Sequence, residues 1–84
     1  MAVRITRTSE RMHTVIQIDG QLRVEDVEEL DREYSCVEGP LVLELADLQS
    51  ADSAGVEALL EVAANGAKLQ GVSPYIELLL KKKF

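Results

Sequence analysis

The side chains of this 84-residue sequence offer few of the groups that catalysis requires. The single histidine, His13, and the single cysteine, Cys36, exclude a two-histidine zinc motif and a paired-cysteine site. No glycine-rich loop of the nucleotide-binding types is present. Serines and carboxylates remain, but His13 lies on a different predicted element from Ser53 and has no spacing that would make it the base for that serine. We therefore expect a non-enzymatic protein without a cofactor or metal ion.

Asp52 and Ser53 are the polar pair with the clearest structural meaning. Asp and Ser are favoured at helix N-caps, and apolar residues with helical spacing follow them from Val56 onward. From residue types alone, the pair needs no role beyond starting this helix, and Gly55 none beyond close packing. The hydroxyl group of Ser53 is nevertheless expected near the backbone amides that the first turn leaves free.

The elements that must position this pair follow from periodicity. Alternating apolar residues predict strands early in the chain, and a hairpin loop is expected at residues 8–11. Asp19-Gly20 predicts a turn that ends the second strand, and residues 46–52 are expected to be a polar loop. The expected strands are 3–6, 14–18, a buried strand 41–45 and a weak strand 67–72. The expected helices are an acidic amphipathic helix 24–34, a helix that begins at 53 and stops at Asn65-Gly66, and a helix 74–80. Ser73 caps the last helix, and Lys81, Lys82 and Lys83 follow it.

Length and charge limit the function. Eighty-four residues make one domain, whose small core leaves room for a partner or a dimer to add stability. Fifteen acidic against nine basic residues give a net charge of −6, which argues against binding nucleic acid. The alternating start argues against a signal peptide, and no apolar stretch is long enough to span a membrane. We expect a cytoplasmic protein, with Cys36 packed as a small apolar residue.

Residues 41–56 resemble the central signature of the STAS domain, the fold shared by anti-sigma factor antagonists and the tails of sulphate transporters. In that family a buried strand and a loop precede an Asp-Ser/Thr pair and a glycine that open a helix, as Asp52, Ser53 and Gly55 do here. Gly20-Gln21-Leu22 resembles the Gly-x-Leu after the family's second strand, and Gly71-Val72-Ser73-Pro74 resembles the entry to its third helix. The resemblance covers nearly all of residues 1–84 and implies a mixed four-stranded sheet with three helices in the order β-β-α-β-α-β-α.

This resemblance also implies a function. In anti-sigma factor antagonists the serine after the motif's aspartate is phosphorylated by a kinase that is also the anti-sigma factor, and Ser53 occupies that position. The implied protein is a partner-switching regulator with no enzymatic activity. The surface implied for the partner comprises Gln49, Ser50, Asp52, Ser53, Ala54, Gly55 and Glu57.

A second function stays open beside the first. Cytoplasmic STAS subunits also attach to the ATPases of ABC-type lipid transport systems, and residues 68–72 are similar to that branch as well. The sequence departs from the family pattern at Arg23, where Asp is frequent, and at Ala54, where Ser or Thr is frequent. Compared with the family pattern, we expect a segment several residues shorter between Gly55 and Gly71 and a C-terminal part shortened by the family's final strand and helix.

Overall fold

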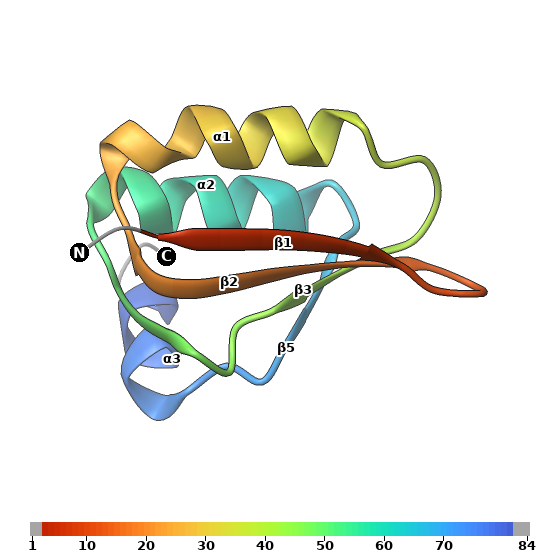
Figure 1. The fold of residues 1–84 in the computed structure, drawn as a ribbon. Helices are drawn as coiled ribbons and strands as arrows, with labels where there is room; N and C mark the ends of the chain where they lie inside the picture. The colour runs from red at the N-terminus through yellow and green to blue at the C-terminus, as the bar shows by residue number, and fades with distance from the viewer. Residues whose placement is uncertain (1–2, 82–84) are drawn as a thin grey trace.

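The computed structural model describes residues 3–81, which form one five-stranded mixed sheet and three helices (Figure 1). The strands are β1 (Arg4–Ser9), β2 (Thr14–Leu22), β3 (Leu41–Glu44), β4 (Leu48–Ala51) and β5 (Lys68–Gln70). The helices are α1 (Val24–Ser35), α2 (Ser53–Ala64) and α3 (Pro74–Lys81). Lys82, Lys83 and Phe84, the last part of the predicted lysine-rich end, lie outside the described residues. The predicted α/β class with a mixed sheet and three helices is confirmed.

The sheet is mixed because β1 and β2 form a hairpin, whereas the later strands return through helices. β1 runs antiparallel to β2, and Ile5 lies opposite Ile18. β3 is parallel to β2, and β5 is parallel to β3, with Leu43 opposite Leu69. The strand order is therefore β1-β2-β3-β5. Helical connections between parallel strands are what the alternation of strands and helices along the chain requires.

Two local predictions about β2 and the segment after β3 were wrong. β2 does not end at Asp19-Gly20 but continues to Leu22, with a register shift at Gly20, whose φ of 91° suits glycine. Beyond this bulge β2 pairs in parallel with β4, which lies within the predicted loop 46–52. The sheet therefore has five strands rather than four. Backbone pairing with β2 stabilises a strand too short to show a clear alternating pattern.

The helix ends follow the predicted capping residues. The hydroxyl oxygen of Ser73 accepts a hydrogen bond from the Ile76 amide at 3.2 Å, which confirms the predicted cap of α3. α2 stops at Asn65, and Gly66 follows with a φ of 107°, so glycine takes the left-handed position that was expected of it.

The core lies mainly between the sheet and its helices. In Figure 1, α1 and α2 lie side by side over one face of the sheet, and α3 lies on the opposite side, next to β4. The largest fully buried side chains come from the strands, from all three helices and from the segment after β3: Ile16, Ile18, Leu22, Leu30, Leu43, Leu45, Leu59 and Ile76. This packing brings the first residues of α1 and α2 to the same edge of the molecule.

Candidate functional site

The predicted partner surface spans β4 and the first turn of α2. Gln49 is exposed and Ser50 is half-buried on β4. In α2, Ser53 and Glu57 are exposed, while Ala54 is half-buried and Gly55 is buried. The structure thus brings these residues together, but Gly55 offers a partner no side-chain surface. Its role in this segment is one of packing.

Asp52 connects the N-termini of two helices through its carboxylate group. Its Oδ1 accepts a hydrogen bond from the Gly55 amide at 2.9 Å, which caps α2. Its Oδ2 accepts a hydrogen bond from the Val24 amide at 3.0 Å, at the first residue of α1. Both groups are amides that a helix leaves without an internal partner. The capping role that residue types suggested for Asp52 is therefore present and extends to a second helix.

The ionised form of Asp52 is favoured by these contacts. The hydrogen bond from the Gly55 amide lowers the pKa of the carboxyl group below its ordinary value, and the amides of Val24 and Ala54 and the charge of Arg23 act in the same direction. Partial desolvation opposes them without reversing the shift. Asp52 is thus a fixed negative charge at this edge of the molecule at neutral pH.

Gly55 lies against the backbone at the end of β2. A Cβ atom built at Gly55 would lie 2.5 Å from the carbonyl oxygen of Leu22, closer than such contacts occur. The same carbonyl oxygen accepts a hydrogen bond from the Asp52 amide at 3.1 Å. Only glycine lets α2 approach β2 this closely, so Gly55 determines how near the starts of α1 and α2 lie to each other.

Ser53 is the first residue of α2, as predicted, and it is exposed. The sequence predicted free backbone amides around the Ser53 hydroxyl group, but Asp52 already engages most of the amides at this helix start. The Asp52 carboxylate group accepts a hydrogen bond from the Gly55 amide and also interacts with the Ala54 amide, whereas the Val56 amide makes the ordinary helical bond to the Asp52 carbonyl oxygen at 2.9 Å. An added group on Ser53 would therefore meet a helix start that is largely occupied.

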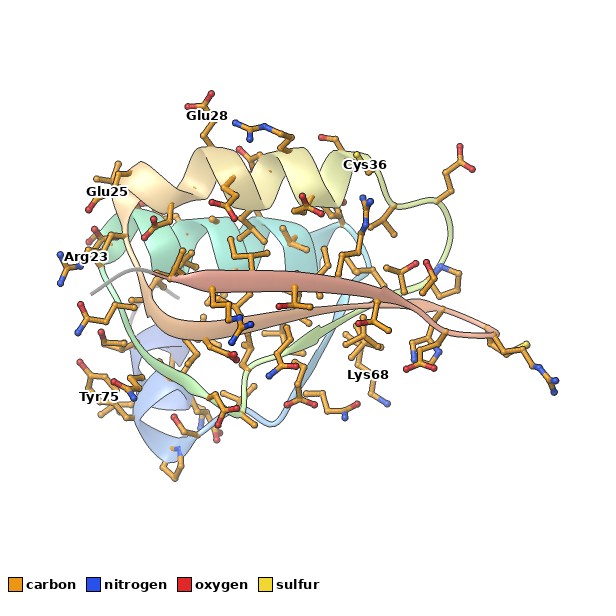
Figure 2. The ribbon with its side chains drawn as sticks, viewed as in Figure 1. Arg23, Glu25, Glu28, Cys36, Lys68 and Tyr75 are labelled. Atoms are coloured by element: carbon orange, nitrogen blue, oxygen red, sulfur yellow. The ribbon has the colours of Figure 1, made fainter. Side chains whose placement is uncertain are left out.

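Arg23 also belongs to this edge, although the sequence interpretation did not include it in the site. It precedes α1, and its guanidinium group donates a hydrogen bond to the side-chain oxygen of Gln21. Figure 2 shows its side chain extending outward at the edge where α1 begins. Its backbone amide donates to Asp26 at 3.1 Å, which helps to start α1. The one available signal was its position directly after Gly20-Gln21-Leu22, the second motif of the resemblance.

A cavity of about 290 Å³ lies at the other end of the two helices. None of the predicted site residues lines it. Its lining residues come from the ends of α1 and α2 and from the segments that follow them: Tyr34, Ser35, Val37, Gly39, Pro40, Leu41, Asn65, Gly66 and Ala67.

Across residues 3–81, no three His, Cys, Asp or Glu side chains lie close enough together to hold a metal ion. No helix of this part of the chain has the length and apolarity needed to cross a membrane.

The expectation that Cys36 is packed was wrong. Cys36 follows the last turn of α1, and its side chain is exposed (Figure 2). Arg7 lies beside it: a hydrogen bond with Cys36, and then the charge of Glu33, raise the pKa of the Arg7 guanidinium group. The Nε atom of Arg7 is 3.6 Å from a carboxylate oxygen of Glu33. The end of a helix leaves a short side chain at the surface when no later element covers it.

Both the sequence and the fold resemble those of known proteins. The family model described as "Mlab, STAS domain" matches residues 5–75. No curated protein sequence matches the chain. Among solved structures, the chain resembles the anti-sigma factor antagonist SpoIIAA in its unphosphorylated form, with a TM-score of 0.67 and 23% identity over 95% of this chain and 82% of that one.

Two further structures have the same fold. An anti-sigma factor antagonist STAS domain from Rhodobacter sphaeroides matches with a TM-score of 0.59 and 19% identity over 80% of this chain and 82% of that one. An uncharacterized protein with a SpoIIAA-like fold from Shewanella loihica, of the DUF3478 family, matches with a TM-score of 0.55 and 12% identity over 96% and 75% of the two chains. At these identities the structural matches establish the fold, and the predicted resemblance is confirmed.

Proposed function

Because the chain belongs to the STAS domain family, we propose that it is a non-enzymatic protein-interaction module that works as an anti-sigma factor antagonist-like regulator. In this proposal it acts in the cytoplasm and exchanges one protein partner for another. The regulated residue is Ser53, and the partner contacts the exposed residues Gln49, Asp52, Ser53 and Glu57 at the β4–α2 edge. Similarity to anti-sigma factor antagonists of known structure supports this function.

The observation that carries the proposal is the placement of Ser53. Its side chain is exposed at the first residue of α2, and Asp52 next to it fixes that helix start through two hydrogen bonds. A serine kinase would transfer the γ-phosphoryl group of ATP to the hydroxyl oxygen of Ser53, releasing ADP and the hydroxyl proton. The product carries about −1.5 to −2 charges at this edge, which a bound partner would sense.

The experiment is to incubate the full chain with candidate serine kinases and ATP and to map phosphate by mass spectrometry. We expect modification at Ser53 and loss of that modification in Ser53→Ala. We also expect the phosphorylated chain to bind its partner more weakly than the unmodified chain does. Ser50→Ala is the matched control, because Ser50 lies three residues away but is half-buried on β4. A competent kinase that leaves Ser53 unmodified would count against the regulatory function.

A second candidate is an accessory cytoplasmic STAS subunit of an ABC-type lipid transport system. The family model that matches residues 5–75 is described as "Mlab, STAS domain" and not as an anti-sigma factor antagonist, which favours this alternative. Residues 68–72, whose similarity to that branch suggested this alternative, form β5 and the turn that follows. Co-purification of the chain with a transporter ATPase, and no exchange of partners on phosphorylation, would support the second candidate over the first.

A further inference from the structure

The start of α2 has little capacity left for a second anion. The carboxylate group of Asp52 accepts a hydrogen bond from the Gly55 amide at 2.9 Å and also interacts with the Ala54 amide, so two of the three amides that the first turn leaves free already face this side chain. A phosphoryl group on Ser53 would therefore compete with a neighbouring carboxylate group of the same charge. A cationic side chain from another element would compensate its charge more strongly than the one remaining amide of the first turn.

Arg23 is placed to do this. The Val24 amide donates to Asp52 Oδ2 at 3.0 Å, and the Asp52 amide donates to the Leu22 carbonyl at 3.1 Å. These two hydrogen bonds hold residues 22–24 against residue 52, so Arg23 and Ser53 are each directly adjacent in sequence to the connected residues. Arg23 is exposed, its guanidinium group donates a hydrogen bond to the neutral side chain of Gln21, and its charge already acts on the carboxylate group of Asp52.

Acidic side chains also lie at the starts of both helices. Glu25 and Asp26 lie in the first turn of α1, Asp52 caps α2, and Glu57 lies one turn after Ser53. Each of them would repel a phosphoryl group. A guanidinium group, in contrast, donates two parallel hydrogen bonds to phosphate oxygens and stays charged at all relevant pH values.

We propose that Arg23 pairs with the phosphoryl group of phosphorylated Ser53 and that this pair connects the starts of α1 and α2. To form it, the guanidinium group gives up its hydrogen bond to Gln21. The inference rests on the proposed phosphorylation of Ser53. Its consequence is that a partner meets an Arg–phosphate pair in the phosphorylated state, in which the guanidinium group offsets only part of the phosphate charge. In the unmodified state, the partner meets a free hydroxyl group with an exposed arginine beside it.

The test uses the full chain with phosphoserine installed at position 53 by genetic code expansion, so no kinase is needed. ³¹P NMR then measures the second pKa of the phosphate, which is about 6 for an isolated phosphoserine. We expect Arg23→Ala and the longer uncharged variant Arg23→Gln to raise this pKa by about half a unit relative to phosphorylated chain with Arg23. Arg23→Lys should restore part of the shift because it restores the charge.

Two controls separate a direct pair from a general change in charge. Arg32→Ala removes an exposed arginine farther along α1 that pairs with Glu28, and it should leave the phosphate pKa unchanged. Phosphoserine at Ser35, at the end of α1, should not respond to Arg23→Ala. The effect at position 53 should also shrink at high salt.

An unchanged phosphate pKa in folded Arg23→Ala and Arg23→Gln proteins would overturn the proposed pair. Thermal melting of the unmodified variants shows whether they are folded. The outcome is separate from that of the proposed function, because kinase assays on the unmodified chain test phosphorylation, whereas the installed phosphoserine tests only the contact with Arg23.

Discussion

The carboxylate group of Asp52 accepts a hydrogen bond from the backbone amide of Val24, a residue 28 positions earlier in the chain, at 3.0 Å. Because the same carboxylate group also caps α2 through Gly55, one side chain satisfies the starts of two helices. It thereby fixes the position of Ser53 relative to α1. The candidate site is therefore an edge at which two helix N-termini meet, and its geometry depends on Asp52 and Gly55.

Replacement of Asp52 should destabilise the fold. Asp52→Ala leaves the amides of Gly55 and Val24 without their acceptor, and we expect the free energy of unfolding to fall by about 2 kcal/mol. Asp52→Asn should lose about half of that, because its single carbonyl oxygen cannot reproduce both contacts. Urea unfolding measures the change. Asp47→Ala, at an exposed turn residue five positions earlier, is the control and should change stability by less than about 0.5 kcal/mol. Equal losses for Asp47→Ala and Asp52→Ala would contradict the double cap.

The contribution of Asp52 should depend on pH. Its pKa is lowered in the folded state, first by the Gly55 amide, from an ordinary value of 3.8. A lowered folded pKa means that the carboxylate group stabilises the fold above the unfolded pKa, and that this stability is lost as the pH falls through the folded pKa. The stability difference between the unsubstituted chain and Asp52→Asn should therefore be constant from about pH 7 to 5 and shrink below about pH 4. Urea midpoints across this range measure it, and a gap that persists undiminished at acidic pH would oppose this assignment.

Gly55→Ala should be more damaging than its size suggests. The added methyl group would lie 2.5 Å from the Leu22 carbonyl oxygen, so α2 or the end of β2 must move. Alanine is the better helix former by about 1 kcal/mol, but we expect the overlap to outweigh this and to destabilise the protein by about 1 to 3 kcal/mol. Denaturant unfolding checks the value. Ser53→Ala, two residues earlier and exposed, should be nearly neutral, and a Gly55→Ala protein as stable as Ser53→Ala would refute the close approach.

The cap of α3 can be tested separately. Ser73→Ala removes the acceptor for the Ile76 amide and should cost about 1 kcal/mol, whereas Ser73→Asp should retain the cap. Faster hydrogen exchange at the Ile76 amide in Ser73→Ala would locate the effect in α3. Ser35→Ala is the matched control, because the Ser35 hydroxyl group donates to the backbone carbonyl oxygen of Asp31 near the end of α1 and caps no helix start. Unchanged exchange at Ile76 would exclude the cap.

The exposure of Cys36 predicts how its thiol group reacts. Because the side chain lies at the surface after α1, Ellman's reagent should modify one thiol per folded chain at a rate close to that of the urea-unfolded chain. A packed cysteine would react only when the protein opens. Strong protection in native buffer would therefore restore the original expectation of a packed side chain.

Local patterns in the sequence were sufficient for most of the elements. Alternation predicted β1 and the first part of β2, and helical spacing predicted α1 and α2, because one face of each element has to be buried. The caps of α2 and α3 and the glycine after α2 followed from residue types that satisfy free backbone groups. These signals are local, and the hydrogen bonds at Ser73 and Asp52 agree with them.

The tertiary structure decided the rest. β4 exists because β2 continues past the bulge at Gly20 and offers it a partner, and four residues are too few to show a period. The contact between Asp52 and Val24, and with it the place of Arg23 near Asp52, joins segments that are 28 residues apart. No local pattern encodes such a contact, since it arises only when α1 and α2 pack side by side on one face of the sheet. The sequence by itself thus determined the family, the main elements and the candidate serine, and the packing of two helices determined what surrounds that serine.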